Sequence, residues 1–319
     1  MWKAVDILRE LRITPILLYF RAQTDLEFPE FKGGFFRSGF GKFLREQSCS
    51  TAEPACENCP KLESCAYSRV FETPCAGCDA RLLRKYPNAP HPFTLGPPLS
   101  PESFLAAGSV FSLRLTLLRD AVEFLPDILR AFHSLGRSGD YGGAYALHRV
   151  ESCVDGQTAW SAETPGDWRQ PPTWEPPEDR HSTRMVIRIL TPLRLRVQGR
   201  YAENPGFVPV AQALLRRIQF LRAFHGCEDA GWLSPLYAGA DRAILERSDL
   251  RVSGSDRWSA RQERRIPMEG VVGSMTVAGE LDGLAPYFEA GQWLHIGSQT
   301  TAGLGMIAVS FPRDSRGGA

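Results

Sequence analysis

One order of expected elements occurs twice along the chain, and it constrains the fold more than any other feature. In the first half, the alternation and spacing of apolar residues predict strand, helix, extended segment, strand, helix and strand at residues 11–28, 31–47, 91–99, 109–118, 124–136 and 136–154. In the second half the order strand, helix, strand, strand, helix and strand returns at residues 183–199, 208–226, 250–261, 269–281, 284–297 and 304–311. The chain therefore predicts an α+β fold of two tandem ferredoxin-like (RRM-like) βαββαβ domains.

A change of composition separates the two expected domains. Residues 154–180 hold five prolines, six acidic residues and three tryptophans, which is typical of a linker or an irregular excursion. We expect an N-terminal domain over residues 1–153, interrupted by a cysteine-rich insert at about 48–90, and a C-terminal domain over residues 181–319. No membrane-crossing segment or signal peptide is visible at the start, so we expect a cytoplasmic protein with no membrane partner.

A glycine-rich loop joins the last expected helix to the last expected strand. Gly291, Gly297, Gly303 and Gly305 fall within fifteen residues, and His295 lies among them. Bare backbone allows amides to approach a phosphate closely, and this is one interpretation of the loop. A plain turn is the alternative, because neither the GxxxxGK[ST] pattern nor a following helix is present.

Arginine is concentrated in one part of the chain although the formal net charge is only +1. Eight arginines and a single acid, Glu203, lie between His181 and Cys227. The arginines are Arg184, Arg188, Arg194, Arg196, Arg200, Arg216, Arg217 and Arg222. A local excess of this kind indicates a phosphate-binding face, whereas an ordinary solvated helix face would mix both signs.

Six cysteines lie within thirty residues of the expected insert. Cys49, Cys56, Cys59 and Cys65 include a CxxC pair and provide the four sulfur ligands that a tetrahedral zinc ion requires. Cys75 and Cys78 add a second CxxC of undetermined role. In a cytosolic chain this pattern favours a structural zinc over disulfides, with an iron–sulfur cluster as the alternative.

Several segments taken together resemble a known family. They are FKGGFFRSGFGKFLR, CAYSRVFE and HPFTLGPP in the first half, and TPLRL, RRIQFLRAFHG, DRWSARQ and LHIGSQTTAGLGMI in the second. This set is similar to the RAMP-superfamily endoribonucleases that cut precursor CRISPR RNA, in the subgroup with a cysteine-rich insert. The resemblance runs from about Pro15 to Phe311 and leaves residues 154–180 unmatched.

The resemblance implies repeat-RNA binding in antiviral defence and RNA cleavage by 2′-hydroxyl attack with no catalytic metal. Such cleavage requires a base, an acid and positive charge on the phosphorane. The implied catalytic candidates are His295, which could instead cap its helix, together with Lys42 and Tyr141. The implied RNA-binding residues are Arg37, Arg45, Arg184, Arg194, Arg196, Arg216, Arg217, Arg257, Arg261, Gly297, Ser298, Gly303 and Gly305.

One departure from the family pattern leaves the function open. Ser298 stands where a lysine is expected, and Met306 where a basic residue is expected. The loop has therefore lost positive charge. This favours an alternative in which the chain is a non-catalytic RAMP subunit that holds CRISPR RNA (crRNA) among other CRISPR effector subunits. A zinc-stabilised scaffold protein without an RNA partner is a further alternative.

Overall fold

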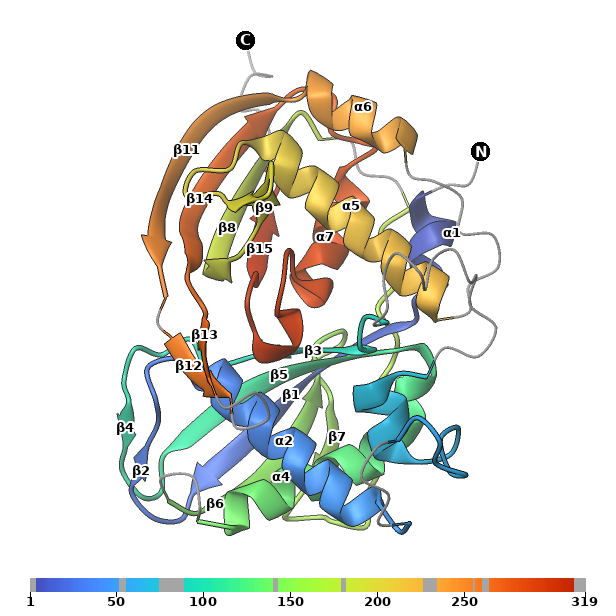
Figure 1. Ribbon diagram of the computed structural model, residues 1–319, viewed down its shortest axis with the longest axis vertical. Coiled ribbons are helices and arrows are strands. Elements are labelled where there is room, and N and C mark those ends of the chain that lie inside the picture. The colour runs from blue at the N-terminus through green and yellow to red at the C-terminus, as the bar shows by residue number, and fades with distance from the viewer. Residues whose placement is uncertain are drawn as a thin grey trace. The chain divides into compact units, whose positions relative to one another are not determined.

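The computed structural model describes residues 4–51, 56–74, 89–139, 143–178, 182–225, 234–254, 256–259 and 264–312, and of residues 234–235, 256–259 and 264–267 only the backbone. The chain divides into two compact units (Figure 1). An N-terminal unit contains residues 12–174 with residues 224–226. A C-terminal unit contains residues 1–11, 175–223 and 227–319.

The N-terminal unit is built on a five-stranded antiparallel sheet in the order β3-β5-β1-β6-β7. Its strands are β1 Ile13–Ala22, β3 Phe93–Gly96, β5 Val110–Leu118, β6 Tyr145–Ser152 and β7 Thr158–Ser161. β1 occupies the centre because every second residue is a large apolar one that packs into the core. The first four strands have the order of a ferredoxin-like sheet, as the sequence predicts.

Two helices cover one face of this sheet, α2 Lys32–Ser48 and α4 Leu125–Arg137 (Figure 1). Phe40 of α2 stacks on Phe132 of α4, with ring centroids 4.7 Å apart, and both side chains are fully buried. Gly39 allows this approach, since a Cβ there would lie 2.3 Å from Leu135. Shorter elements connect the layers: β2 Leu26–Glu27, η1 Ser68–Glu72, β4 Phe104–Leu105 and η2 Arg119–Phe124.

The expected linker at residues 154–180 differs in the structure. β7 lies within it and pairs with β6, where Trp160 is opposite Val150. Further on, the Trp174 N–H donates to the Ile13 carbonyl over 2.7 Å. The reason is physical: β6 would otherwise be an open edge, and this segment satisfies its backbone groups. Residues as far as 174 thus belong to the N-terminal unit.

The C-terminal unit repeats the plan with a four-stranded antiparallel sheet in the order β11-β14-β8-β15. Its strands are β8 Arg184–Leu193, β11 Ile244–Ser253, β14 Gly270–Ala278 and β15 Ile307–Ser310. Helices α5 Phe207–Phe224 and α7 Ala285–Leu294 pack together, with Phe207 stacked on Phe288 at 5.6 Å. A further helix, α6 Ser234–Arg242, precedes β11.

Two short hairpins interrupt strands that the sequence predicts as continuous. The expected strand at 183–199 ends as β8 at Leu193 and turns into β9 Arg196–Val197 and β10 Arg200–Tyr201. The turn contains Gln198 and Gly199, both with positive φ, which reverses the chain within two residues. The expected strand at 250–261 likewise divides between β11 and a hairpin of β12 Asp256–Ser259 and β13 Arg264–Pro267.

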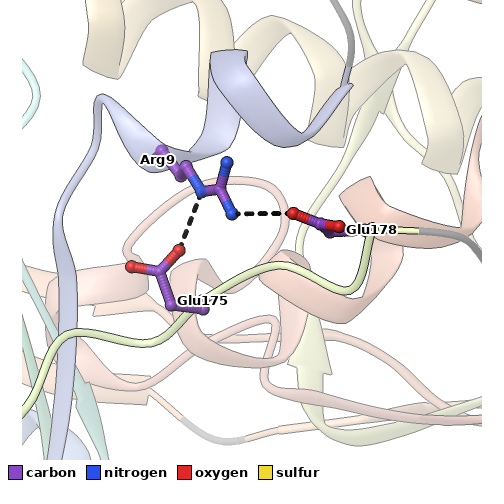
Figure 2. Close-up of polar contacts among 3 residues, drawn as sticks. All are labelled: Arg9, Glu175 and Glu178. Carbon is purple, nitrogen blue, oxygen red and sulfur yellow. Dashed lines mark hydrogen bonds and ion pairs between the residues drawn. The ribbon is translucent and has the colours of Figure 1, made fainter.

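The first residues of the chain belong to the C-terminal unit, not to the N-terminal domain expected over 1–153. Helix α1 Ala4–Arg9 carries Arg9, which lies between Glu175 at 2.9 Å and Glu178 at 3.3 Å (Figure 2). Glu10 receives two hydrogen bonds from the buried guanidinium of Arg222 in α5, the shorter at 2.7 Å. These contacts fix α1 to its own unit. Among the helices of the described residues, none is both long and apolar enough to span a bilayer.

The Phe40–Phe132 stack generates a test of the N-terminal core. Phe40→Ala removes a fully buried ring and should cost about 3–5 kcal/mol in the free energy of unfolding. Glu46→Ala, exposed on the same helix, is the matched control and should change that energy by less than about 0.5 kcal/mol. Urea denaturation followed by circular dichroism measures both. Equal effects would show that the stack does not stabilise this unit.

Candidate functional site

The glycine loop is closed by hydrogen bonds to the end of β8. The Thr191 hydroxyl donates to the Gly303 carbonyl over 2.7 Å and accepts from the Met306 N–H over 2.9 Å. The Gly305 N–H donates to the Pro192 carbonyl, and the Ile296 N–H to the Gly305 carbonyl. A 3-10 turn, η3 Thr300–Ala302, lies between them. The loop is therefore a fixed structure before any ligand binds.

Two of the glycines are required by backbone packing. Gly305 has φ +66°, and a Cβ there would lie 1.7 Å from the Ile296 carbonyl oxygen. Gly297 has φ +85°, and its Cβ would lie 2.6 Å from the Arg194 carbonyl oxygen. An L side chain fits neither the conformation nor the space at these positions.

The residues of the loop that are predicted to face RNA differ in their exposure. Gly303 and Gly305 are buried, and their N–H groups donate to the carbonyls of Thr300 and Pro192. Ser298 is exposed, and Gly297 is half-buried beside it. The accessible part of the loop is therefore its first turn, at Gly297 and Ser298. The second turn, at Gly303 and Gly305, is buried and hydrogen-bonded within the unit.

His295 lies inside the C-terminal unit. It follows α7 as the C-cap, with φ +59°, and its N–H donates to the Gly291 carbonyl over 2.9 Å. Its side chain has no exposed surface. A proton cannot pass between a buried imidazole and an RNA backbone in solvent, so the position favours the capping role over the catalytic one.

An aromatic and arginine cluster lies beside the exposed turn of the loop. The guanidinium carbon of Arg194 is 4.0 Å from the centre of the Tyr201 ring, and that of Arg196 is 4.8 Å from it. Arg194 also touches the loop, because its carbonyl accepts from the Ser298 N–H over 3.2 Å. We call Arg194, Arg196, Tyr201 and Ser298 the hairpin cluster. The sequence analysis did not single out Tyr201; the Gln198-Gly199 pair was the turn signal that could have revealed it.

Two arginines of the expected phosphate-binding face serve the interior. Arg217 on α5 donates from Nε to the Leu294 carbonyl at the end of α7 over 2.7 Å, and burial lowers its pKa to about 10. Arg222, buried, pairs with Glu10. A positively charged side chain at a helix C-terminus satisfies its last carbonyls. The arginine stretch is therefore not one continuous face, and the guanidinium of Arg217, which is predicted to contact RNA, is engaged by the Leu294 carbonyl.

The other arginines of the C-terminal unit have varied surroundings. Arg216 is exposed on α5, and Arg184 at the start of β8 pairs with Glu246 at 2.6 Å. Arg257 belongs to β12, of which only the backbone is described, and Arg261 lies outside the described residues. The structure thus places Arg194 and Arg196 together and leaves Arg184 and Arg216 on other elements.

Helix α2 presents the basic residues of the N-terminal unit. Arg37 lies over Phe71 at 5.6 Å and Arg45 over Tyr67 at 5.5 Å, while those two rings stack on each other. Both arginines are half-buried, whereas Lys42 is exposed with its Nζ 5.0 Å from the Phe43 ring. Tyr141, the third catalytic candidate, lies outside the described residues. Lys42 is the catalytic candidate that the described side chains leave accessible.

The four cysteines expected to bind metal converge on one small cavity. Cys49, Cys56, Cys59 and Cys65 all line it. Burial raises the pKa of the Cys56 thiol. Within the described residues, however, no three His, Cys, Asp or Glu side chains stand in an arrangement that could hold a metal ion. The four thiols thus line the same cavity, but their geometry is not that of a metal-coordination site. Cys75 and Cys78 lie outside the described residues.

Two family models match the chain, one in each half. A model named AF_1859_N and described as an N-terminal domain matches residues 11–172, just over half of the 319 residues. The model described as CRISPR-associated endoribonuclease Cas6 matches residues 187–307, which contain both the hairpin cluster and the glycine loop. An uncharacterized protein of Archaeoglobus fulgidus is 26% identical over 137 residues, or 43% of this chain. The alignment spans 45% of that relative.

Solved structures share the fold at low sequence identity. A Cas6 product complex covers 93% of this chain and all of its own, with a TM-score of 0.55 and 19% identity. A Thermus thermophilus Cas6 gives 0.53 and 19%, over 93% of this chain and 98% of its own. A partial Cas6-RT-Cas1–Cas2 complex gives 0.57 and 11%, over 95% of this chain but 46% of that longer one. The chain therefore belongs to the family whose N-terminal domain the AF_1859_N model describes, and its second half is similar in sequence and fold to the CRISPR-associated endoribonuclease Cas6.

Proposed function

We propose that this chain binds CRISPR repeat RNA and cleaves precursor transcripts into guide RNAs. The observation that carries the proposal is the match of the Cas6 model to residues 187–307, because that segment holds the fixed glycine loop and the arginines beside it. Its substrate would be a transcript, which favours a cytoplasmic location. The chain in the Cas6-RT-Cas1–Cas2 complex is similar to it in fold, and other CRISPR proteins are therefore proposed as partners.

The reaction needs no metal. A ribose 2′-oxygen attacks the adjacent phosphorus, its proton passes to a base, and the 5′-oxygen leaves with a proton from an acid. The products are a 2′,3′-cyclic phosphate and a 5′-hydroxyl. The protein must hold the phosphate in line and stabilise the extra negative charge of the phosphorane.

Two sets of residues fit parts of this task. The exposed turn at Ser298 can donate hydrogen bonds to a phosphate, and Arg194 and Arg196 supply positive charge beside it. On α2, the ammonium of Lys42 is accessible and can stabilise the phosphorane or protonate the leaving oxygen. His295 fits neither task because it is buried.

A non-catalytic RNA-binding subunit is the second candidate. The burial of His295 and the serine at position 298 favour it, because together they leave the loop with neither a proton donor nor a fixed positive charge. The two candidates share the RNA contacts and differ only in cleavage. Incubating the full chain with a repeat hairpin RNA in EDTA separates them.

The catalytic assignment is tested by single-turnover cleavage. Lys42→Ala should slow cleavage about 100-fold or more, the scale expected for losing transition-state charge, and Lys42→Arg should retain most of the rate. His295→Ala should bind and cut the RNA within about threefold of the wild type, because its side chain does not meet solvent. Normal cutting by Lys42→Ala would exclude Lys42. A wild type that binds tightly and never cuts would favour the non-catalytic candidate.

The hairpin cluster is tested by the salt dependence of binding. Replacing Arg194 and Arg196 with Ala should lower the slope of log affinity against log salt by about 0.9 for each lost duplex phosphate contact. Arg184→Ala is the matched control, since that guanidinium already pairs with Glu246, and its slope should change less. Filter binding at several salt concentrations measures all three proteins. An unchanged slope in the double variant would remove this cluster from the RNA contacts.

We also propose that Cys49, Cys56, Cys59 and Cys65 hold a structural metal ion, with zinc favoured over an iron–sulfur cluster. The support is their sulfur chemistry and their convergence on one cavity. A bound cation would stabilise the thiolates, which burial alone disfavours, and would cross-link the segment that carries them. It would take no part in RNA cleavage.

The metal proposal is tested by composition and stability. Elemental analysis of purified protein should find about one zinc per chain, and visible absorbance would reveal iron and sulfide instead. Cys56→Ser combined with Cys59→Ser should abolish metal binding and lower the melting temperature, whereas Cys153→Ser should leave the metal content unchanged. Native disulfides among the four cysteines in a metal-free wild type would refute the proposal.

A further inference from the structure

A β-bulge in the N-terminal sheet changes the direction of one side chain. Along the pairing of β1 with β6, Tyr19 is opposite Arg149 and Phe20 is opposite Leu147, so His148 has no partner on β1. In a regular strand, His148 and Arg149 would point to opposite faces. The extra residue re-aims the strand locally, and bulges of this kind are common beside functional sites.

Two contacts show that His148 and Arg149 share a face. Arg149 lies over the ring of Tyr19, with its guanidinium carbon 4.4 Å from the ring centre. His148 Nε2 is 3.3 Å from Arg21 Nη2. Tyr19 and Arg21 are two residues apart on β1 and therefore point to the same side of the sheet. We call Tyr19, Arg21, His148 and Arg149 the bulge patch.

The bulge patch lies on the face of the sheet opposite the core helices. Phe20, which alternates with Tyr19 and Arg21, packs into the core against Phe132 of α4. Arg21 is exposed, the side chain of Arg149 is 41% exposed, and Tyr19 and His148 are half-buried. The patch is therefore accessible on a face that the hydrophobic core does not use.

The contact with Arg21 pairs one ring nitrogen of His148 with a guanidinium. Because a guanidinium can only donate, this contact is a hydrogen bond in the tautomer whose Nε2 accepts. In that tautomer Nδ1 carries a proton and is a hydrogen-bond donor. This arrangement provides donors that suit a phosphate or a ribose hydroxyl.

The balance of charge at the patch favours an anion. Arg21 and Arg149 are positive, and Glu151 pairs with Arg149 at 3.2 Å. Arg114 lies opposite Leu17 on the same face, and although burial lowers its pKa to about 10, it remains charged at neutral pH. Tyr19 adds an aromatic ring beneath a guanidinium, an arrangement on which nucleotide bases stack.

We propose that the bulge patch binds a single-stranded stretch of RNA, with a base stacked at Tyr19 and Arg149 and phosphate or ribose contacts from Arg21 and His148. An RNA strand fits better than an acidic peptide, because an acidic peptide would gain nothing from the aromatic ring. Unpaired bases are required, since bases within a duplex cannot reach a ring on a sheet. The proposal rests on the proposed RNA function and adds a site to it that neither the glycine loop nor α2 supplies.

Binding of two labelled RNAs to the full chain tests the patch: an unstructured octauridylate and a repeat stem without flanks. Tyr19→Ser should weaken octauridylate binding about tenfold and leave stem binding unchanged, and the matched control Tyr19→Phe should bind both as the wild type does. Arg21→Gln combined with Arg149→Gln should lower the octauridylate salt slope by about 0.7 for each lost contact. Circular dichroism confirms that each variant is folded.

Each outcome bears on one proposal only. Octauridylate binding that is equal in wild type, Tyr19→Ser and the double arginine variant overturns the bulge patch, even if the wild type cleaves repeat RNA normally. Equal losses in Tyr19→Phe and Tyr19→Ser overturn the stacking role. Preference of the wild type for a polyglutamate peptide over octauridylate also overturns the patch as an RNA site. A wild type that binds octauridylate through the patch but neither binds nor cuts the repeat refutes the proposed function and leaves the patch intact.

Discussion

The glycine loop depends on one hydroxyl group. Thr191, at the end of β8, bridges the Gly303 carbonyl and the Met306 N–H, and these two hydrogen bonds tie both sides of the loop to the central strand of its sheet. Two backbone hydrogen bonds, from the Gly305 N–H to the Pro192 carbonyl and from the Ile296 N–H to the Gly305 carbonyl, hold the same part of the loop. A valine at position 191 would keep the shape and lose both bonds. The buried Thr191 therefore anchors the second half of the loop, whereas the Arg194 carbonyl holds the exposed turn at Ser298.

Periodicity predicted both sheets and all four covering helices, because burial of one face is what the alternation and the helical spacing encode. It could not predict β7, which lies within a stretch rich in tryptophan and proline and pairs with the open edge that β6 offers. The hairpin of β9 and β10 was missed for the opposite reason: Arg196 and Arg200 alternate with other residues as a continuing strand would, and the reversal depends on two positive φ angles.

The candidate site was less predictable than the fold, because the type of a residue does not reveal whether its side chain points to solvent or to the interior. Arg216 and Arg217 are neighbours in sequence, yet one is exposed and the other caps α7 from the interior. The same limit applies to His295, which stands beside the loop in sequence and inside the unit in space. At His148 a single extra residue reverses the side-chain direction, and no apolar pattern marks it. The four cysteines of the insert line one cavity, although within the described residues their side chains do not stand in an arrangement that could hold a metal ion.

The positive charge missing from the loop has a counterpart in the hairpin. Ser298 takes the place of a basic residue, but its N–H is held by the carbonyl of Arg194, whose guanidinium stands on Tyr201 together with that of Arg196. A guanidinium stacked on a ring loses less freedom on binding phosphate than a flexible lysine does, and it contacts two oxygens at once. Guanidinium groups positioned in this way are suited to binding the phosphates of an RNA backbone. Acid catalysis is a different task, since an arginine does not give up its proton near neutral pH, and that task falls to groups outside the loop.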